Sequence, residues 1–486
     1  MGISRKPGFI ERYYICRNVE RYYTNLSIIV EIDKIVDADL ISNALRNMVL
    51  KNPWFTLNFY RIDDSILDSE SNGHNFEVRP VKHIKFTDVV KFETITSSVD
   101  EDLLEGINKL NCPMNELCLP LWRIIVYQNE EQPAKQYICF YCDHSLFDGV
   151  AALEFQKDLL KEISDVYCSK STAFQEFLFE LEADVDPDHY EVPQARENEF
   201  DLYETPLTEA SNSRVSNSLV FKKNENMTGI NEANGKKILE KSKLFNYPTV
   251  STNTNSRYRT SSFEPEIVGK MLKFCKSQGI TLTSYFDIIC LQCLQETVFK
   301  DIKSKDDDEF STSTLLAVNG RRYYDTSKFV YGTMAAALEM NFGPMPPIED
   351  ANITLDLMKA THKEVGDSIT TRECFLARSQ HKELNNWSYF SAYLKGSKIK
   401  TTCVFSNLGV FHEHPNCHWR AKDIWFSLNT SIMYNFIFNL VSLQEGRLKL
   451  VFVFRQEYEE VMSEKETKSV DNLMKLLETK LADFCS

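Results

Sequence analysis

The sequence predicts an α/β (α+β) protein made of two lobes, each mixing strands with helices. The chain has 486 residues, more than one ordinary hydrophobic core holds, so we expect two or three domains or two similar lobes. In both halves, apolar runs of strand length alternate with longer segments of helical periodicity. An acidic and polar stretch with several prolines separates the halves. We therefore place an N-terminal lobe at 1–170, a crossover at 171–255 and a C-terminal lobe at 256–486.

The first lobe begins with a segment of mixed aromatic and charged residues. Phe9 to Tyr23 predicts an amphipathic helix, and packing on the core is favoured over contact with a membrane because the charges are mixed rather than basic. Behind it we expect strands at Ser27 to Ile32, Phe55 to Ile62, Phe76 to Val81 and Trp122 to Tyr127, and helices at Asp39 to Lys51 and Glu101 to Leu110. These elements build a mixed sheet with helices against it.

One unit in this lobe carries chemistry. The apolar run Tyr137 to Cys142 predicts a strand, and the segment Val150 to Tyr167 has helical periodicity. Between them lies Asp143-His144-Ser145-Leu146-Phe147-Asp148-Gly149. The unit is therefore a strand, an H-x-x-x-D-G turn and a helix.

The residue types of this turn suit proton transfer. An imidazole fixed at a strand end, such as His144, takes a proton from a hydroxyl or an amine as that group attacks a carbonyl. Asp148, at the entry of a helix, is better placed to pair with a cation or cap the turn than to act as a second base. Gly149 permits a backbone geometry that a side chain would hinder. The alternative is a buried histidine satisfied by a backbone partner, and the local motif alone does not separate the two.

The second lobe repeats the mixture of helix and strand. Two of its strands end in polar motifs: Ser313 to Val318 runs into Asn319-Gly320-Arg321-Arg322, and Thr401 to Phe405 runs into Ser406-Asn407-Leu408-Gly409. We expect further strands at Ala335 to Asn341, around Phe426, and at Ile432 to Val441 and Leu448 to Phe454, with helices at Glu266 to Ser277, Thr281 to Phe299, Thr354 to Val365, His381 to Tyr393 and Glu464 to Phe484. Polar motifs thus stand at three strand ends of the chain.

Composition excludes some classes of protein. A formal charge of −15 argues against a nucleic-acid surface, which needs a basic face. No apolar run approaches the roughly 20 residues that span a bilayer, and no apolar core follows the first basic residues, so we expect a cytoplasmic protein. The 13 cysteines fit reduced thiols. His412 to His418 is dense in metal-capable groups, but no second cluster has ligand spacing, so we expect no metal and interpret this stretch as a polar loop.

The three polar motifs, in this order and each after a strand, resemble the CoA-dependent acyltransferase superfamily, which includes chloramphenicol acetyltransferase and peptide-synthetase condensation domains. Within it, the chain most resembles the fungal alcohol acetyltransferase family. Gly8-Phe9-Ile10-Glu11-Arg12-Tyr13-Tyr14 is similar to that family's opening, and Leu121-Trp122-Arg123-Ile124-Ile125 to its strand before the histidine. The resemblance spans nearly the whole chain. It implies two chloramphenicol-acetyltransferase-like lobes with an active-site tunnel between them.

The resemblance also implies roles for single residues. His144 is expected to act as general base, and Asp148 to hold the turn through a salt bridge whose partner we predict to be Arg321. Ser406, Asn407 or a backbone amide beside them lines the tunnel and donates to the oxyanion; the alternative is a tight turn made by Asn407 and Gly409. Asp143 stands where part of the superfamily carries a first histidine, which changes the local hydrogen bonding.

Three functions stay open. The leading one is acetyl-CoA-dependent acetyl transfer to an apolar alcohol, with acetyl-CoA as co-substrate. The same chemistry serves a long-chain, sphingoid-like amine, as in an N-acetyltransferase relative of the family. The third is a non-catalytic binding protein with the same fold. We expect a monomer, and peripheral association with endoplasmic reticulum or lipid droplets through the terminal amphipathic segments remains an alternative to a purely cytoplasmic location.

Overall fold

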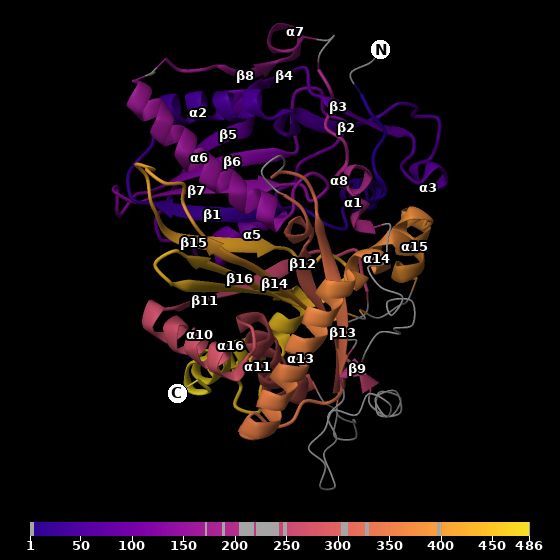
Figure 1. Cartoon of the computed structure of the whole chain (residues 1–486), viewed down its shortest axis with the longest axis vertical. Coiled ribbons are helices and arrows are strands. Elements are labelled where there is room, and N and C mark those ends of the chain that lie inside the picture. Colours follow the sequence, from indigo (N-terminus) through magenta and orange to yellow (C-terminus); the bar gives the residue numbers. More distant parts are fainter. Residues whose placement is uncertain are drawn as a thin grey trace.

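The computed structural model describes residues 4–170, 173–186, 190–203, 218–219, 243–245, 250–302, 310–325, 330–395, 399 and 401–485. Within these residues most strands belong to two large sheets, which lie one above the other in Figure 1. Helices cover the upper sheet from above and the lower sheet from below (Figure 1). The predicted α/β (α+β) class is confirmed.

The upper sheet has five strands in the order β15-β1-β7-β6-β5. Their bounds are Ala421–Leu428 for β15, Leu26–Ile32 for β1, Gln136–Cys142 for β7, Trp122–Asn129 for β6 and Val90–Ile95 for β5. β7 lies in the middle, antiparallel to both neighbours, and every one of its residues is buried. A strand that is apolar throughout suits this position, because both faces of the sheet are covered there.

Helices and small sheets surround this upper sheet. Helix α2 (Ala38–Lys51) packs against α6 (Gly149–Ser169), and α5 (Glu101–Lys109) lies beside β1. Two small sheets pair β2 (Leu57–Arg61) with β3 (Phe76–Pro80) and β4 (His83–Lys85) with β8 (Phe177–Glu180). The shorter helical turns here are α3 (Asp68–Ser71), α4 (Phe86–Val89), α7 (Leu181–Asp184) and α8 (Arg196–Glu199).

The lower sheet has eight strands in the order β11-β17-β16-β14-β12-β13-β9, with β10 paired to β12. Their bounds are Ser256–Phe263 for β11, Leu448–Arg455 for β17, Tyr434–Leu443 for β16, Thr401–Phe411 for β14, Phe310–Asn319 for β12, Ala335–Phe342 for β13, Ser218–Leu219 for β9 and Lys243–Leu244 for β10. The sheet is mixed, because β14 runs parallel to β12 and β16 while β17 is antiparallel to β16.

The helices below this sheet centre on α11 (Leu282–Leu294), which packs against α10, α13 and α16. Helix α11 is capped by Thr281, whose side chain accepts from the backbone N–H of Ser284, and burial contributes most to this helix because it is buried almost throughout. The remaining bounds are Pro265–Gln278 for α10, Lys300–Ile302 for α12, Ala351–Thr371 for α13, Glu373–Ser379 for α14, Asn386–Leu394 for α15 and Ser469–Asp483 for α16.

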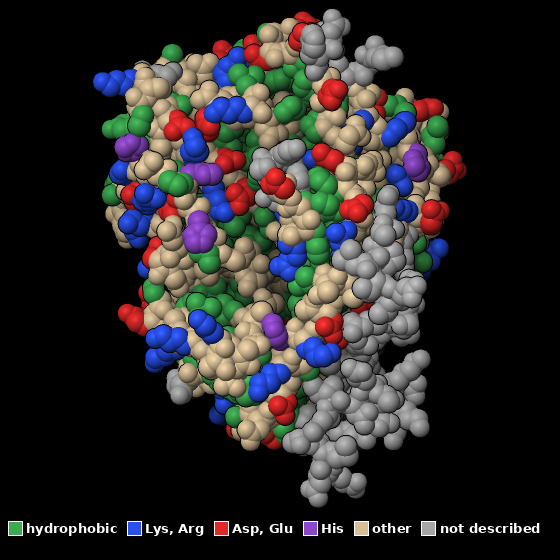
Figure 2. Space-filling view, viewed as in Figure 1, with side chains coloured by type: hydrophobic (Ala, Val, Ile, Leu, Met, Phe, Trp, Pro, Cys, Tyr) green, Lys and Arg blue, Asp and Glu red, His purple; other side chains and the backbone are tan. Residues whose placement is uncertain are grey.

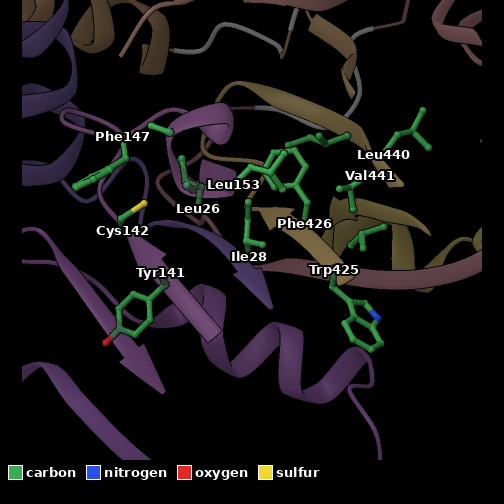
Figure 3. Close-up of a cluster of buried hydrophobic side chains, with 14 of the residues drawn as sticks. Leu26, Ile28, Tyr141, Cys142, Phe147, Leu153, Trp425, Phe426, Leu440 and Val441 are labelled. Carbon is green, nitrogen blue, oxygen red and sulfur yellow. The ribbon is translucent and has the colours of Figure 1, made fainter. Parts of the chain in front are cut away.

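One strand leaves its expected sheet. The sequence places the strand around Phe426 in the C-terminal sheet, but β15 pairs with β1 at the edge of the upper sheet. Figure 3 shows Phe426 of β15 among Ile28 of the upper sheet and Val441 of the lower one, with Trp425 pointing to the other side of the strand. The pairing buries these rings at the junction of the lobes, which the strand's own sequence does not reveal. The boundary between lobes is thus crossed by a strand.

The first helix also differs from its prediction. Helix α1 (Phe9–Val19) is not amphipathic, because ten consecutive residues from Phe9 to Asn18 are buried on all sides. In this position it does not present an apolar face to a membrane. Its charged residues Glu11, Arg12 and Arg17 lie inside the protein.

On the described parts of the chain, the cysteines and the metal-capable side chains do not gather into clusters. All 13 cysteines are free and most are buried. Among the described residues, no helix has the length and apolarity to cross a membrane, and no group of three metal-capable side chains converges. In the predicted polar loop, His414 contacts Asp158 and His418 contacts Cys168. Figure 2 shows acidic and basic side chains interspersed over one face of the molecule.

Candidate active site

The H-x-x-x-D-G turn joins the central strand β7 to the long helix α6. Asp148 is the N-cap of α6, where its Oδ1 accepts a hydrogen bond of 2.9 Å from the backbone N–H of Ala151. A Cβ placed on Gly149 would lie 2.7 Å from Cδ2 of Leu408 in β14, so a larger residue here would have to displace that side chain of the lower lobe. The turn is therefore fixed between both lobes.

A buried ion pair crosses from the turn to the other lobe. Nη1 of Arg321, just after β12, lies 2.8 Å from Oδ2 of Asp148, and both side chains are at most 5% exposed. The same Oδ2 accepts a bond of 2.8 Å from the backbone N–H of Met334. Burial alone would raise the pKa of Asp148, but the Arg321 guanidinium and these hydrogen bonds outweigh it and hold the pKa below its ordinary value. Asp148 is therefore an ionised structural group.

Arg321 is tied on its other side to the segment before β13. Its Nε donates to the carbonyl of Val330 at 2.9 Å and its Nη2 to that of Gly332 at 2.6 Å. Thr333, in the same segment, donates its hydroxyl to the backbone carbonyl of His144 at 2.9 Å. Sequence reasoning did not identify this segment, which has no motif of its own. It holds the histidine through the backbone.

His144 is half-buried and stacked on a tyrosine. The imidazole lies parallel to the Tyr14 ring of α1, with centroids 4.5 Å apart and planes 8° apart. Tyr23 meets its edge at 6.0 Å. The Nδ1 atom is buried and has no hydrogen-bond partner among the described residues. Stacking on Tyr14 therefore fixes the plane of the imidazole.

The surroundings of His144 keep it neutral. Burial lowers its pKa to about 4, the nearby charge of Asp148 opposes this shift, and the guanidinium groups of Arg17 and Arg378 add to it. At neutral pH the imidazole is therefore unprotonated and able to accept a proton.

Asp143 organises the turn from inside. Its Oδ2 accepts a hydrogen bond of 2.7 Å from Nδ2 of Asn18 in α1, and its Oδ1 accepts one of 2.8 Å from the backbone N–H of Ser145. Burial raises the pKa of this carboxyl despite these bonds. Where part of the superfamily has a histidine, this chain thus has a buried carboxyl that links the turn to the first helix.

The Ser406-Asn407-Leu408-Gly409 motif lies within a strand rather than after one. β14 continues to Phe411 through a register shift between Asn407 and Val410, where Gly409 adopts a left-handed φ of +77°. Asn407 is engaged locally: its Oδ1 accepts from the backbone N–H of Gly409 at 2.9 Å and its Nδ2 reaches Thr283 at 3.4 Å. Ser406 is half-buried, and no described residue is hydrogen-bonded to its hydroxyl. The Ser406 hydroxyl is therefore free to bind another group, whereas the Asn407 side chain is already hydrogen-bonded.

Some residues near His144 were not predicted, namely Tyr14 and Arg17 of α1 and Arg378 of α14. The run of alternating aromatic and charged residues in Phe9 to Tyr23 was the available signal. Such a run makes a poor surface helix, and its burial places these side chains beside the turn that carries His144.

A two-lobed fold and a neutral histidine held at the end of a central strand agree with the acyltransferases that the sequence resembles. Among solved structures, the chain is similar to the TRI3 trichothecene 15-O-acetyltransferase from Fusarium sporotrichioides, at 13% identity and a TM-score of 0.64 over 99% of this chain and 95% of that one. It is also similar to the condensation domain of the polyketide synthase MokA, at 12% identity and a TM-score of 0.58 over 99% and 97% of the two chains. At these identities the likeness shows the fold.

Comparison of the sequence with protein families identifies the family. The model of the alcohol acetyltransferase family matches residues 6–481, and the chain belongs to that family. A curated relative, alcohol O-acetyltransferase 1 of Saccharomyces cerevisiae, is 21% identical over 191 residues. That match covers 34% of this chain and 36% of the relative, so it spans only about a third of either protein.

The ion pair between Asp148 and Arg321 gives a first prediction. Replacing Arg321 with Met leaves a buried carboxylate unpaired, and we expect a loss of about 3 to 5 kcal/mol in the free energy of unfolding. Urea unfolding measures it. The exposed neighbour is the matched control: Arg322→Met is expected to change stability by less than about 0.5 kcal/mol. Equal stability of the two variants would show that the pair is not what holds the turn.

Proposed function

We propose that the protein transfers an acetyl group from acetyl-CoA to the hydroxyl of an alcohol, with His144 as general base. The hydroxyl oxygen attacks the thioester carbonyl while Nε2 of His144 takes its proton. The tetrahedral intermediate then collapses, the carbon–sulfur bond breaks, and the CoA thiolate leaves and recovers the proton from the imidazolium. The products are an acetate ester and free CoA. The observation that carries the proposal is the neutral, stacked imidazole at the turn, in a chain of the alcohol acetyltransferase family.

The cysteines support direct transfer without an acyl-enzyme. Cys142, two residues before His144, is fully buried, and burial raises its pKa well above the ordinary value. Burial likewise raises the pKa of Cys112 to about 12. Thiols in this state are poor nucleophiles. In this proposal His144 activates the acceptor itself, and Asp148 and Arg321 position the turn without touching the reacting atoms.

The charges around His144 favour an alcohol over an amine. A long-chain amine reaches the site mainly as an ammonium ion, and Arg17 and Arg378 place positive charge close enough to lower the pKa of His144. Those cations would repel it. An alcohol is neutral and meets no such penalty. The binding-protein alternative has no observation in its favour. The tunnel between the two lobes, acetyl-CoA as co-substrate and a peripheral membrane location remain expectations.

The defining experiment measures the release of free CoA from acetyl-CoA, with isoamyl alcohol and a sphingoid-like amine as acceptors. We expect alcohol-dependent release that falls at least about 100-fold in His144→Ala, because general-base catalysis typically supplies about that factor or more. His83→Ala, on strand β4, is the control that separates loss of the His144 base from a general effect of replacing a histidine. Release with the amine alone would make the protein an N-acetyltransferase, and no release with any acceptor would favour the binding protein.

The pH dependence follows from the pKa of His144. Because burial lowers this pKa to about 4, the basic form predominates at any pH well above that value. We expect kcat/KM to change little as the pH falls from about 8 to about 6, since kcat/KM reports the groups of the free enzyme. An acidic limb centred near the ordinary histidine value of about 6.5 would contradict the burial of His144 in the free protein.

Ser406 is our candidate donor to the oxyanion, because its hydroxyl is available and Asn407 is occupied within the bulge. A donor of this kind acts mainly on kcat, so we expect Ser406→Ala to lower kcat by about 100-fold or more with little change in KM. Asn407→Ala is the comparison and should lower the thermal midpoint instead, since its side chain holds the bulge. Unchanged turnover in Ser406→Ala would remove Ser406 as a donor and leave a backbone amide in that role.

A further inference from the structure

Arg17, in helix α1, is a buried arginine whose guanidinium has no hydrogen-bond or ion-pair partner among the described residues. Its side chain is inside the protein, with the residue 3% exposed, and among the described residues it forms no ion pair and no hydrogen bond. The other arginines buried to a similar degree each donate at least one hydrogen bond; they are Arg12, Arg123, Arg321 and Arg455. Buried guanidinium groups are almost always paired. Arg17 therefore stands out within the described chain.

Three aromatic rings lie beside this guanidinium. Its carbon lies 5.4 Å from the centroids of both Tyr13 and Tyr14, and 4.7 Å from that of Tyr23. Such contacts favour a cation but satisfy none of its N–H groups. Asp143 lies within electrostatic reach of Arg17, yet the hydrogen bonds to its carboxylate come from Asn18 and Ser145.

A second guanidinium lies on the same pair of rings. Arg378, in α14 of the other lobe, is 5.5 Å from the Tyr13 centroid and 5.6 Å from that of Tyr14. Its one hydrogen bond among the described residues goes to the Tyr14 hydroxyl at 3.3 Å, and its Nε is buried without a partner. Two cations from different lobes thus converge on the ring that stacks against His144, with no carboxylate paired to either.

Further polar atoms without partners lie around the same stack. The hydroxyl groups of Tyr23 and Tyr203 and Nδ1 of His144 are buried and have no hydrogen-bond partner among the described residues. Native proteins leave few such atoms, and a concentration of them indicates a site for a polar ligand. With two cations beside them, the ligand chemistry that fits is an anion.

Of the two substrates, the acceptor is the one that can place an anionic group beside Arg17 and Arg378. The acetyl thioester is uncharged, and the phosphates of CoA are separated from it by the whole pantetheine arm. The guanidinium carbons lie 5.4 and 5.6 Å from the centroid of the Tyr14 ring, and neither group is hydrogen-bonded to His144. This spacing suits a charged group some bonds away from the attacking hydroxyl rather than the oxyanion itself.

We propose that Arg17 and Arg378 bind a carboxylate of the acceptor, so that the preferred substrate is a hydroxy acid rather than a plain alcohol. This inference rests on the proposed acetyl transfer and names its substrate class. The hydroxyl of the acid faces His144, and its carboxylate lies between the two guanidinium groups. A bidentate bond from one arginine fixes the orientation of the acceptor.

The test compares acceptors that differ only in charge. Free-CoA release is measured with straight-chain alcohols and with the ω-hydroxy acids of the same carbon number, over a series of lengths. We expect kcat/KM at one length to favour the acid at least about tenfold, which a single charged hydrogen bond supplies. Arg17→Gln and Arg378→Gln should each reduce this preference about tenfold, mainly through KM for the acid, and Arg17→Lys should keep part of it. Arg12→Gln, a buried arginine of the same helix, is the matched control and should keep the preference.

Several results would overturn the inference. Alcohol turnover without any preference for the acid would reject it and leave the acetyl transfer standing, whereas no release from either acceptor would reject the acetyl transfer itself. An equal fall of kcat on acid and alcohol in Arg17→Gln would assign the arginine to the oxyanion. A dicarboxylic acyl-CoA that replaces acetyl-CoA with an Arg17-dependent gain, using a plain alcohol, would place the carboxylate on the donor.

Discussion

The buried ion pair between Asp148 and Arg321 is the interaction on which the site depends. One carboxylate caps α6, accepts a backbone N–H from the segment before β13 and meets the guanidinium from the end of β12. Because these partners come from both lobes, the position of His144 is set by the junction rather than by its own loop. A charge pair that is removed from water contributes little net stability, but it tolerates no alternative geometry, since either partner alone would be costly. The pair therefore fixes the geometry of the turn more than it adds to the stability of the fold.

Helix α1 is the second support, and it extends the site beyond the motif. The carboxylate of Glu197, from the predicted crossover, accepts the backbone N–H of Ile10 at 2.8 Å and so satisfies the start of the helix. Burial raises the pKa of Glu197 to about 7, and the nearby carboxylate of Glu11 adds to the rise. The crossover is therefore, in part, packed structure that holds α1 and with it Tyr14 against His144. Composition marked this stretch as acidic and polar, but composition alone does not show which of its residues turn inward.

Local patterns predicted the parts of the site that depend on local sequence. The strand, turn and helix around His144 follow from periodicity, whereas Arg321 as the partner of Asp148 was predicted from the family resemblance of its Asn-Gly-Arg turn. Pairing between distant strands has no such signature, so β15 was assigned to the wrong sheet. The motif at Ser406 was expected after a strand because Asn and Gly favour turns, whereas the same residues here make a bulge inside one. Helix α1 and its packing on the core were predicted correctly, but its amphipathic character was wrong, because periodicity cannot describe a helix buried on every side.

The electrostatics of His144 connect these elements to the acceptor. Burial and two guanidinium groups lower its pKa, while Asp148 opposes them from a distance fixed by its own pairing. A base with so low a pKa is always available at neutral pH but is intrinsically weak, since proton transfer improves as the pKa of the base approaches the working pH. On the inference above, a bound carboxylate would neutralise much of the field of Arg17 and Arg378. The imidazole would then become more basic only when the acceptor is in place. The same two cations that select an anionic substrate would thereby couple its binding to the strength of the catalytic base.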